Sequence, residues 1–128
     1  MKHNLLADVF STIKNAEKIG RQQCIVKSSS LAKAVLDIMK KHEYIEGYES
    51  AGEARGGSIR VKLKKRINDC NIITPRFNVR VKDFTEYEKR FLPAFNIGVL
   101  LLTTSKGVMD HKQAKAEGMG GRLLGYVY

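Results

Sequence analysis

The chain has 128 residues, of which 43% are hydrophobic, so it can form one domain or two small ones and its composition argues against wholesale disorder. Its formal net charge of +10 favours a polyanionic partner, nucleic acid first and an acidic membrane surface second. No apolar run approaches the roughly 20 residues of a membrane helix. Cys24 and Cys70 lack the spacing of a metal site or a disulfide framework, so we expect an intracellular protein with reduced thiols, no metal and no cofactor.

The first residues lead directly into an amphipathic pattern, so no signal peptide is expected. Apolar side chains recur at helical spacing from Leu5 to Ala16, with Asn4 as the expected N-cap and Gly20 as the expected end. Lys14 and Asn15 lie on the polar face of this helix. Such a face is either solvated or in contact with a partner.

A short strand over residues 23–27 follows, and three serines come directly after it. Ser28, Ser29 and Ser30 either cap a second helix or also bind phosphate at its N-terminus. The expected buried face of that helix consists of four apolar residues: Leu31, Val35, Ile38 and Met39.

Two strands come next, over residues 44–48 and 58–64, with a loop over residues 52–57. A basic cluster then leads into a polar, turn-rich link, which predicts an N-terminal subdomain at 1–66 and a C-terminal subdomain at 67–128. The pattern predicts an α+β chain of two small α/β subdomains. The first has the order helix, strand, helix, strand, strand, and the second is a small, mostly antiparallel sheet with short helices.

The second subdomain is predicted to begin with an alternating strand over residues 77–82. A capping box at Thr85 is expected to start a helix that stops before Pro93. The run from Ile97 to Thr103 is apolar at nearly every position, which predicts a central strand covered on both faces.

A polar tip follows this buried strand. Thr104, Ser105, Lys106 and Gly107 place hydroxyls, an ammonium and a flexible glycine where they can bind phosphate or sugar oxygens from a rigid base. Nothing in the tip matches a phosphate-binding loop of nucleotide hydrolases.

Asp110 is the expected cap of a short helix that Gly118 ends, and a terminal strand is expected from Leu123 to Tyr128. The glycines between them, Gly120 and Gly121, fit a tight turn that also leaves the backbone accessible to a ligand. His111 is interpreted as a surface histidine beside the cap. Its neighbourhood lacks the setting of a serine nucleophile, and no catalytic or metal-binding residue is predicted.

The basic residues occur at strand ends, helix starts and loops, interleaved with hydroxyls and amides. They are Lys14, Lys27, Lys64, Arg66, Lys106, Lys112 and Arg122. Basic groups attract phosphates, and hydroxyls and amides contact 2′-hydroxyls and base edges. With aromatic residues at 8% and no tryptophan, base stacking on an open sheet is disfavoured. This inventory favours a folded RNA helix read in its minor groove.

In chain order, several segments resemble the universal small-subunit ribosomal protein eight family, in its archaeal and eukaryotic branch. The matching residues are 6–8, 13–16, 67–68, 70, 75–77, 88–90, 92–93, 102–111, 120–121 and 124–128. One departure is visible, since Phe95-Asn96-Ile97 stands where a more polar, arginine-containing approach to the central strand is typical of the family.

The resemblance implies a primary rRNA-binding protein of the cytoplasmic small ribosomal subunit that organises the central domain of its rRNA beside neighbouring ribosomal proteins. It implies no catalysis, no membrane and no small-molecule substrate. The expected RNA-binding residues are Thr104, Ser105, Lys106, Gly107, Gly120, Gly121, Arg122, Lys14, Asn15, Ser28, Ser29 and Ser30. A free RNA-binding translational regulator is the alternative, and an enzyme that uses Ser105 or Cys24 is a third hypothesis.

Overall fold

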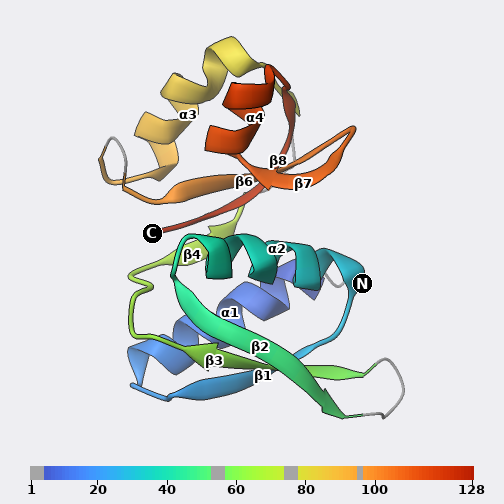
Figure 1. The fold of residues 1–128 in the computed structure, drawn as a ribbon. Coiled ribbons are helices and arrows are strands. Elements are labelled where there is room, and N and C mark those ends of the chain that lie inside the picture. Colours follow the sequence, from blue (N-terminus) through green and yellow to red (C-terminus); the bar gives the residue numbers. More distant parts are fainter. Residues whose placement is uncertain (1–4, 53–56, 74–77, 95–96) are drawn as a thin grey trace, which may run out of the picture. The chain divides into compact units, whose positions relative to one another are not determined.

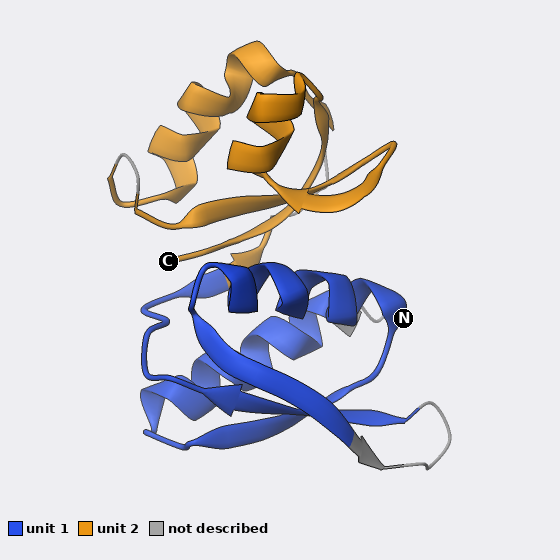
Figure 2. Ribbon diagram, in the orientation of Figure 1, with its two compact units in different colours: residues 1–70 blue, residues 71–128 orange. Residues whose placement is uncertain are grey.

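The computed structural model of this chain describes residues 5–52, 57–73, 78–94 and 97–128. The chain divides into two compact units, residues 1–70 and 71–128 (Figure 2). This division follows Cys70, whereas the sequence places the boundary after Arg66. Within the described ranges, every helix is too short or too polar to cross a membrane.

The first unit is a three-stranded antiparallel sheet in the order β1-β3-β2, with both helices on one side of it (Figure 1). Its elements are α1 (Leu5–Lys18), β1 (Gln23–Lys27), α2 (Ser30–Lys41), β2 (Ile45–Gly52) and β3 (Ser58–Leu63). Side chains alternate between buried and exposed along β1, because one face meets the helices and the other is open. The predicted element order is confirmed.

Both helices of this unit have termini that the sequence predicts. Gly20 adopts the left-handed φ of 78°, and the amide of Arg21 donates to the carbonyl of Ala16 at 2.9 Å, which closes α1. The hydroxyl of Ser29 accepts from the amide of Ala32 at 3.0 Å, which caps α2. The buried face of α2 differs from the prediction, since Leu31 is half-buried and Ala32 is fully buried.

The second unit contains a five-stranded sheet in the order β4-β8-β6-β7, with β5 paired to β8. Helices α3 and α4 lie on the same side of this sheet (Figure 1). The elements are β4 (Cys70–Ile72), β5 (Asn78–Val79), the 3-10 helix η1 (Val81–Asp83), α3 (Phe84–Phe91), β6 (Val99–Thr104), β7 (Gly107–Asp110), α4 (His111–Glu117) and β8 (Gly121–Val127). The α+β class with two antiparallel sheets is confirmed.

Strand β6 lies between β8 and β7, and its residues from Val99 to Leu102 are all buried. This confirms the central strand covered on both faces. The predicted start is wrong, because Ile97 lies before the strand with half of its surface exposed and Gly98 turns the chain with a φ of 86°. A Cβ on Gly98 would lie 2.7 Å from the carbonyl oxygen of Val127, so the entry to β6 needs glycine.

Two predictions before β6 are also wrong. Within the alternating pattern over residues 77–82, the described residues 78–82 contain only the two-residue strand β5, because the chain turns into η1 at Val81. Helix α3 begins at Phe84 rather than after a cap at Thr85, since the fully buried Phe84 ring anchors its first turn in the core. The helix does stop before Pro93, as predicted.

Two short strands, β4 and β7, are not predicted from the sequence. They have only three and four residues, and segments this short carry little periodic signal. Four sequence interpretations lie wholly or mostly outside the described residues: the N-cap Asn4, the loop around Arg55-Gly56, the segment Pro75-Arg76-Phe77, and the departure at Phe95-Asn96-Ile97, of which Ile97 alone is described.

Candidate nucleic-acid interface

The polar tip is the turn of a β-hairpin between β6 and β7. Thr104 pairs with Gly107, which leaves Ser105 and Lys106 as an exposed two-residue turn. The hydroxyl of Thr104 donates to the carbonyl of Gly107 at 2.9 Å and accepts from the amide of Lys106 at 3.1 Å. Thr104 therefore holds the turn together. Ser105 and Lys106 are exposed to solvent at the end of the buried strand β6.

Lys106 also contacts an acidic neighbour. Its Nζ lies 3.4 Å from Oε1 of Glu117 at the end of α4, and Nε2 of Gln113 donates to the other oxygen of that carboxylate at 3.2 Å. Exposed pairs of this kind contribute little free energy. A phosphate can therefore replace Glu117 as the partner of Lys106 at small cost.

Strand β8 carries a second group of predicted residues to the same end of this sheet. Arg122 pairs with Thr103 of β6 and with Asn78 of β5, and it is exposed. Arg122 therefore lies one register position from the Thr104–Gly107 turn, and the sheet brings the two groups together.

Gly120 and Gly121 are required by the sheet itself. A Cβ on Gly121 would overlap the carbonyl oxygen of Thr103, and a Cβ on Gly120 would overlap the carbonyl oxygen of Val79. These glycines allow β8 to approach its neighbouring strands closely. The prediction that Gly120 and Gly121 form a tight turn is incomplete, because Gly121 is the first residue of strand β8.

The interpretation of His111 as a surface residue is wrong. The ring is 3% exposed, and its Nδ1 accepts from the amide of Leu100 at 3.0 Å. Because Nδ1 accepts a hydrogen bond, the proton of the neutral ring belongs on Nε2, which lies 3.3 Å from Oε1 of Glu88. His111 thus ties α4 to β6 and α3 beneath the hairpin.

Asp110 performs the role predicted for it. Its carboxylate accepts from the amide of Gln113 at 2.8 Å and caps α4, and Gly118 closes that helix with a left-handed φ of 67°. The helix that carries Glu117 is therefore fixed at both ends.

The predicted residues of the first unit lie on separate elements. Lys14 of α1 forms an ion pair with Asp69 at 2.7 Å, and Asn15 beside it is exposed. Ser28, Ser29 and Ser30 lie at the start of α2, where Ser29 serves as the cap. The two groups lie at different places in the unit, one within α1 and the other at the start of α2.

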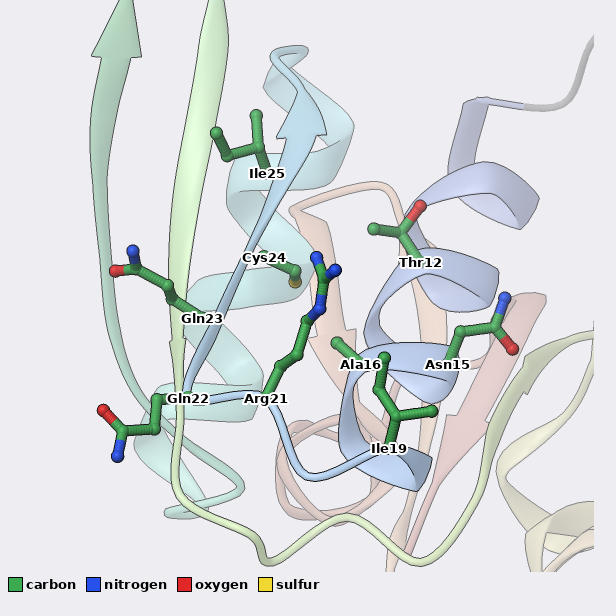
Figure 3. Close-up of a pocket in the computed structure, with 9 residues that line it drawn as sticks. All are labelled: Thr12, Asn15, Ala16, Ile19, Arg21, Gln22, Gln23, Cys24 and Ile25. Carbon is green, nitrogen blue, oxygen red and sulfur yellow. The ribbon is translucent and has the colours of Figure 1, made fainter.

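Asn15 borders an open depression of about 670 Å³ between α1 and β1 (Figure 3). Arg21 extends between these two elements, and the side chains of Gln22 and Gln23 point away from α1 (Figure 3). Sequence reasoning missed these three polar residues. The only signal was their position beside Gly20 in the turn between a helix and a strand.

Neither cysteine has the character of a nucleophile. Burial, with a smaller contribution from the Glu17 carboxylate, raises the pKa of Cys24 to about 11. Burial, followed by the nearby Asp69 carboxylate, raises the pKa of Cys70 to about 12. At neutral pH both are protonated thiols with low reactivity. Within the described ranges, no three His, Cys, Asp or Glu residues form a group that could hold a metal ion.

Comparison with known proteins identifies close relatives. The family model described as ribosomal protein S8 matches residues 4–128. The small ribosomal subunit protein uS8 of Picrophilus torridus is 43% identical over 129 residues, which cover 100% of both chains. The uS8 of Methanocorpusculum labreanum is 45% identical over 99% of this chain and 98% of its own. The uS8A of Schizosaccharomyces pombe is 40% identical over 100% of this chain and 99% of its own.

Proposed function

The chain belongs to the ribosomal protein S8 family, and from this premise we propose that it is a structural constituent of the small ribosomal subunit that binds rRNA. Its role is to hold RNA in shape within the particle in the cytoplasm, and not to catalyse a reaction. Neighbouring small-subunit proteins are its other partners. The RNA segment that it recognises lies in the central domain of the small-subunit rRNA.

The observation that carries the proposal is the end of the second sheet, where the Ser105-Lys106 turn and Arg122 lie together. The hydroxyl of Ser105 supplies a directional contact to a 2′-hydroxyl or base edge, and the two basic side chains supply phosphate contacts. Because Thr104 and the buried strand β6 hold the turn in place, little order has to be imposed on binding. Residues 67–128 are therefore the principal RNA-binding subdomain.

The first unit supplies further contacts in this proposal. Asn15 is exposed beside Lys14, and the hydroxyls of Ser28 and Ser30 flank the capped start of α2. An rRNA phosphate near Lys14 competes with Asp69 for its ammonium. The contribution of these residues is secondary, because part of this polar inventory is already bonded within the fold.

The test is the affinity of the purified chain for a central-domain rRNA fragment. Ser105→Ala is expected to weaken binding by roughly 1–3 kcal/mol, because it leaves polar RNA groups without a partner in the interface. Affinity should also fall steeply as salt rises. Equal affinity of the wild-type chain for this fragment and for unrelated duplex RNA would contradict the proposal. Sedimentation of a lysate separates a subunit constituent, which travels with the particle, from a free regulator.

A further inference from the structure

A second depression, on the first unit, is formed where β3 ends. We call it the lysine depression; its volume is about 430 Å³ and its lining residues are Gln22, Gln23, Glu46, Lys62, Leu63, Lys64 and Lys65. Lys62 pairs with Gln23 of β1 across the sheet, and with Gly47 of β2 on the other side. The irregularity of β2 between Ile45 and Gly47 adds Glu46 to the rim. Gln23, Glu46 and Lys62 are exposed on the face of the sheet that the helices leave open.

The charges of this surface do not balance. Three lysines line it against one glutamate. Lys64 has a weak partner, since its Nζ lies 3.9 Å from the exposed carboxylate of Glu43. Among the described residues, Lys62 and Lys65 form no ion pair, in contrast to Lys14 and Lys106. The positive charge of this surface is therefore less compensated by carboxylates than that of Lys14 or Lys106.

The backbone at Lys65 is a second, independent observation. Lys65 has a φ of 60°, a left-handed conformation that is costly for an L residue and free for glycine. A lysine at a position that suits glycine indicates that its side chain has a use there. Among the described non-glycine residues, positive φ otherwise occurs only at Glu43, the partner of Lys64.

The chemistry of the lining favours an RNA backbone. Lysine ammonium groups contact phosphates as point charges, and the amides of Gln22 and Gln23 both donate and accept, as contacts to 2′-hydroxyls require. The one apolar lining residue, Leu63, is buried, so a partner would find no hydrophobic anchor. An apolar protein segment is thus a poor occupant.

We propose that the lysine depression is a further RNA-binding site, in which Lys62 and Lys65 contact phosphates and Gln22 and Gln23 contact the adjacent riboses. This inference rests on the proposed function, since it assigns a second RNA segment to the same rRNA-binding chain. It adds four residues that neither the motifs of the sequence nor the family resemblance assigned.

Binding to small-subunit rRNA tests the site through its salt dependence. In the double variant Lys62→Gln/Lys65→Gln, the slope of log affinity against log salt should become shallower by about 1.5, and affinity should fall roughly tenfold or more at low salt. Lys82→Gln/Lys89→Gln is the matched control, because it also removes two positive charges, and both lysines are exposed on surfaces that neither proposal uses. A double variant with the slope of the control would overturn the inference.

Lys65→Gly distinguishes an effect of the lost charge on RNA binding from an effect on stability. Glycine relieves the left-handed backbone, so the variant should be at least as stable as the wild-type chain while binding RNA as weakly as Lys65→Gln. Wild-type affinity in Lys65→Gly would overturn the assignment of this lysine. If Ser105→Ala alone weakens binding, the inference fails and the proposed function stands. If the wild-type chain does not bind the rRNA, both fail.

A tethered cleavage reagent locates the contact directly. Because Cys24 and Cys70 are buried with raised pKa values, a single cysteine introduced by Lys62→Cys or Ser105→Cys can be labelled selectively in the folded chain. The tether at position 62 should cleave rRNA nucleotides distinct from those cleaved by the tether at position 105. Cleavage from position 62 no stronger than from a Lys89→Cys control would overturn the site.

Discussion

The two units of this chain hold their predicted RNA-binding residues in different ways. In the second unit, Ser105, Lys106 and Arg122 meet at one end of a sheet, and Thr104 bonds within the turn so that its neighbours face outward. In the first unit, Ser29 is bonded to the backbone of α2 and Lys14 to Asp69. The same residue types are thus exposed for a partner in one unit and bonded within the fold in the other.

This difference shows that a polar residue beside a basic one does not define a contact. Whether its donors are already used within the fold decides how much it can offer to RNA. By this criterion the lysine depression, with Lys62 and Lys65 in no ion pair among the described residues, is a stronger candidate than Ser29. Variants that separate stability from affinity sharpen the comparison.

The largest expected effect in stability concerns the glycines of the second unit. Gly121→Ala should lower the free energy of unfolding by roughly 1–3 kcal/mol, because its Cβ has to displace the backbone of Thr103. Chemical denaturation measures this loss. Gly118→Asn is the control, since asparagine tolerates the left-handed conformation and a Cβ there meets nothing within 4 Å. Unchanged stability in Gly121→Ala would mean that this glycine serves RNA access rather than strand pairing.

The next effect belongs to the first unit and depends on pH. The folded pKa of Cys70 is raised from 9.0 to about 12, so its contribution to stability is complete below pH 9 and is lost as pH rises toward 12. Raising the pH from 8 to 9.5 should cost about 1 kcal/mol through Cys70, and less through Cys24, where solvent screens the charge more.

Comparison with the double variant Cys24→Ala/Cys70→Ala isolates the thiols from the tyrosines and lysines that also titrate. The stability of this variant should depend less on pH over the same range. Parallel curves for the two proteins would contradict burial of the thiols in solution.

The smallest expected effects concern two serines, one in each unit: one substitution should lower stability and the other should lower RNA affinity. Ser29→Ala should lower the free energy of unfolding by about 1 kcal/mol through loss of the α2 cap. Ser105→Ala should leave stability within roughly 0.5 kcal/mol, since the side chain is exposed, while it weakens rRNA binding. Denaturation and RNA titration of both variants check this crossover. If Ser29→Ala lost as much rRNA affinity as Ser105→Ala, the two serines would contribute equally to RNA binding, and the contrast between the units would fail.

Local pattern was sufficient for the caps of α2 and α4 and for the existence of the strands with regular burial. The apolar run that ends in Leu102 predicted a central strand, and Asp110 and Gly118 predicted the two ends of α4, because caps and periodicity act over a few residues. The start of that strand was wrong by two residues. Ile97 is as apolar as its neighbours, and only the turn at Gly98 excludes it from the sheet.

The sequence by itself determined the α+β class, the order of most elements, the polar tip after the buried strand and, through its resemblance, the family. These features depend on residue type and short spacing, which the chain displays directly. Only the tertiary structure decided that His111 is buried between β6 and α3, and that Gly121 must lack a Cβ because the carbonyl oxygen of Thr103 lies so close. It also decided that Lys62 and Lys65 share one open surface with Gln22 and Gln23. Those facts follow from pairing and packing between distant segments, whose partners no local pattern can specify.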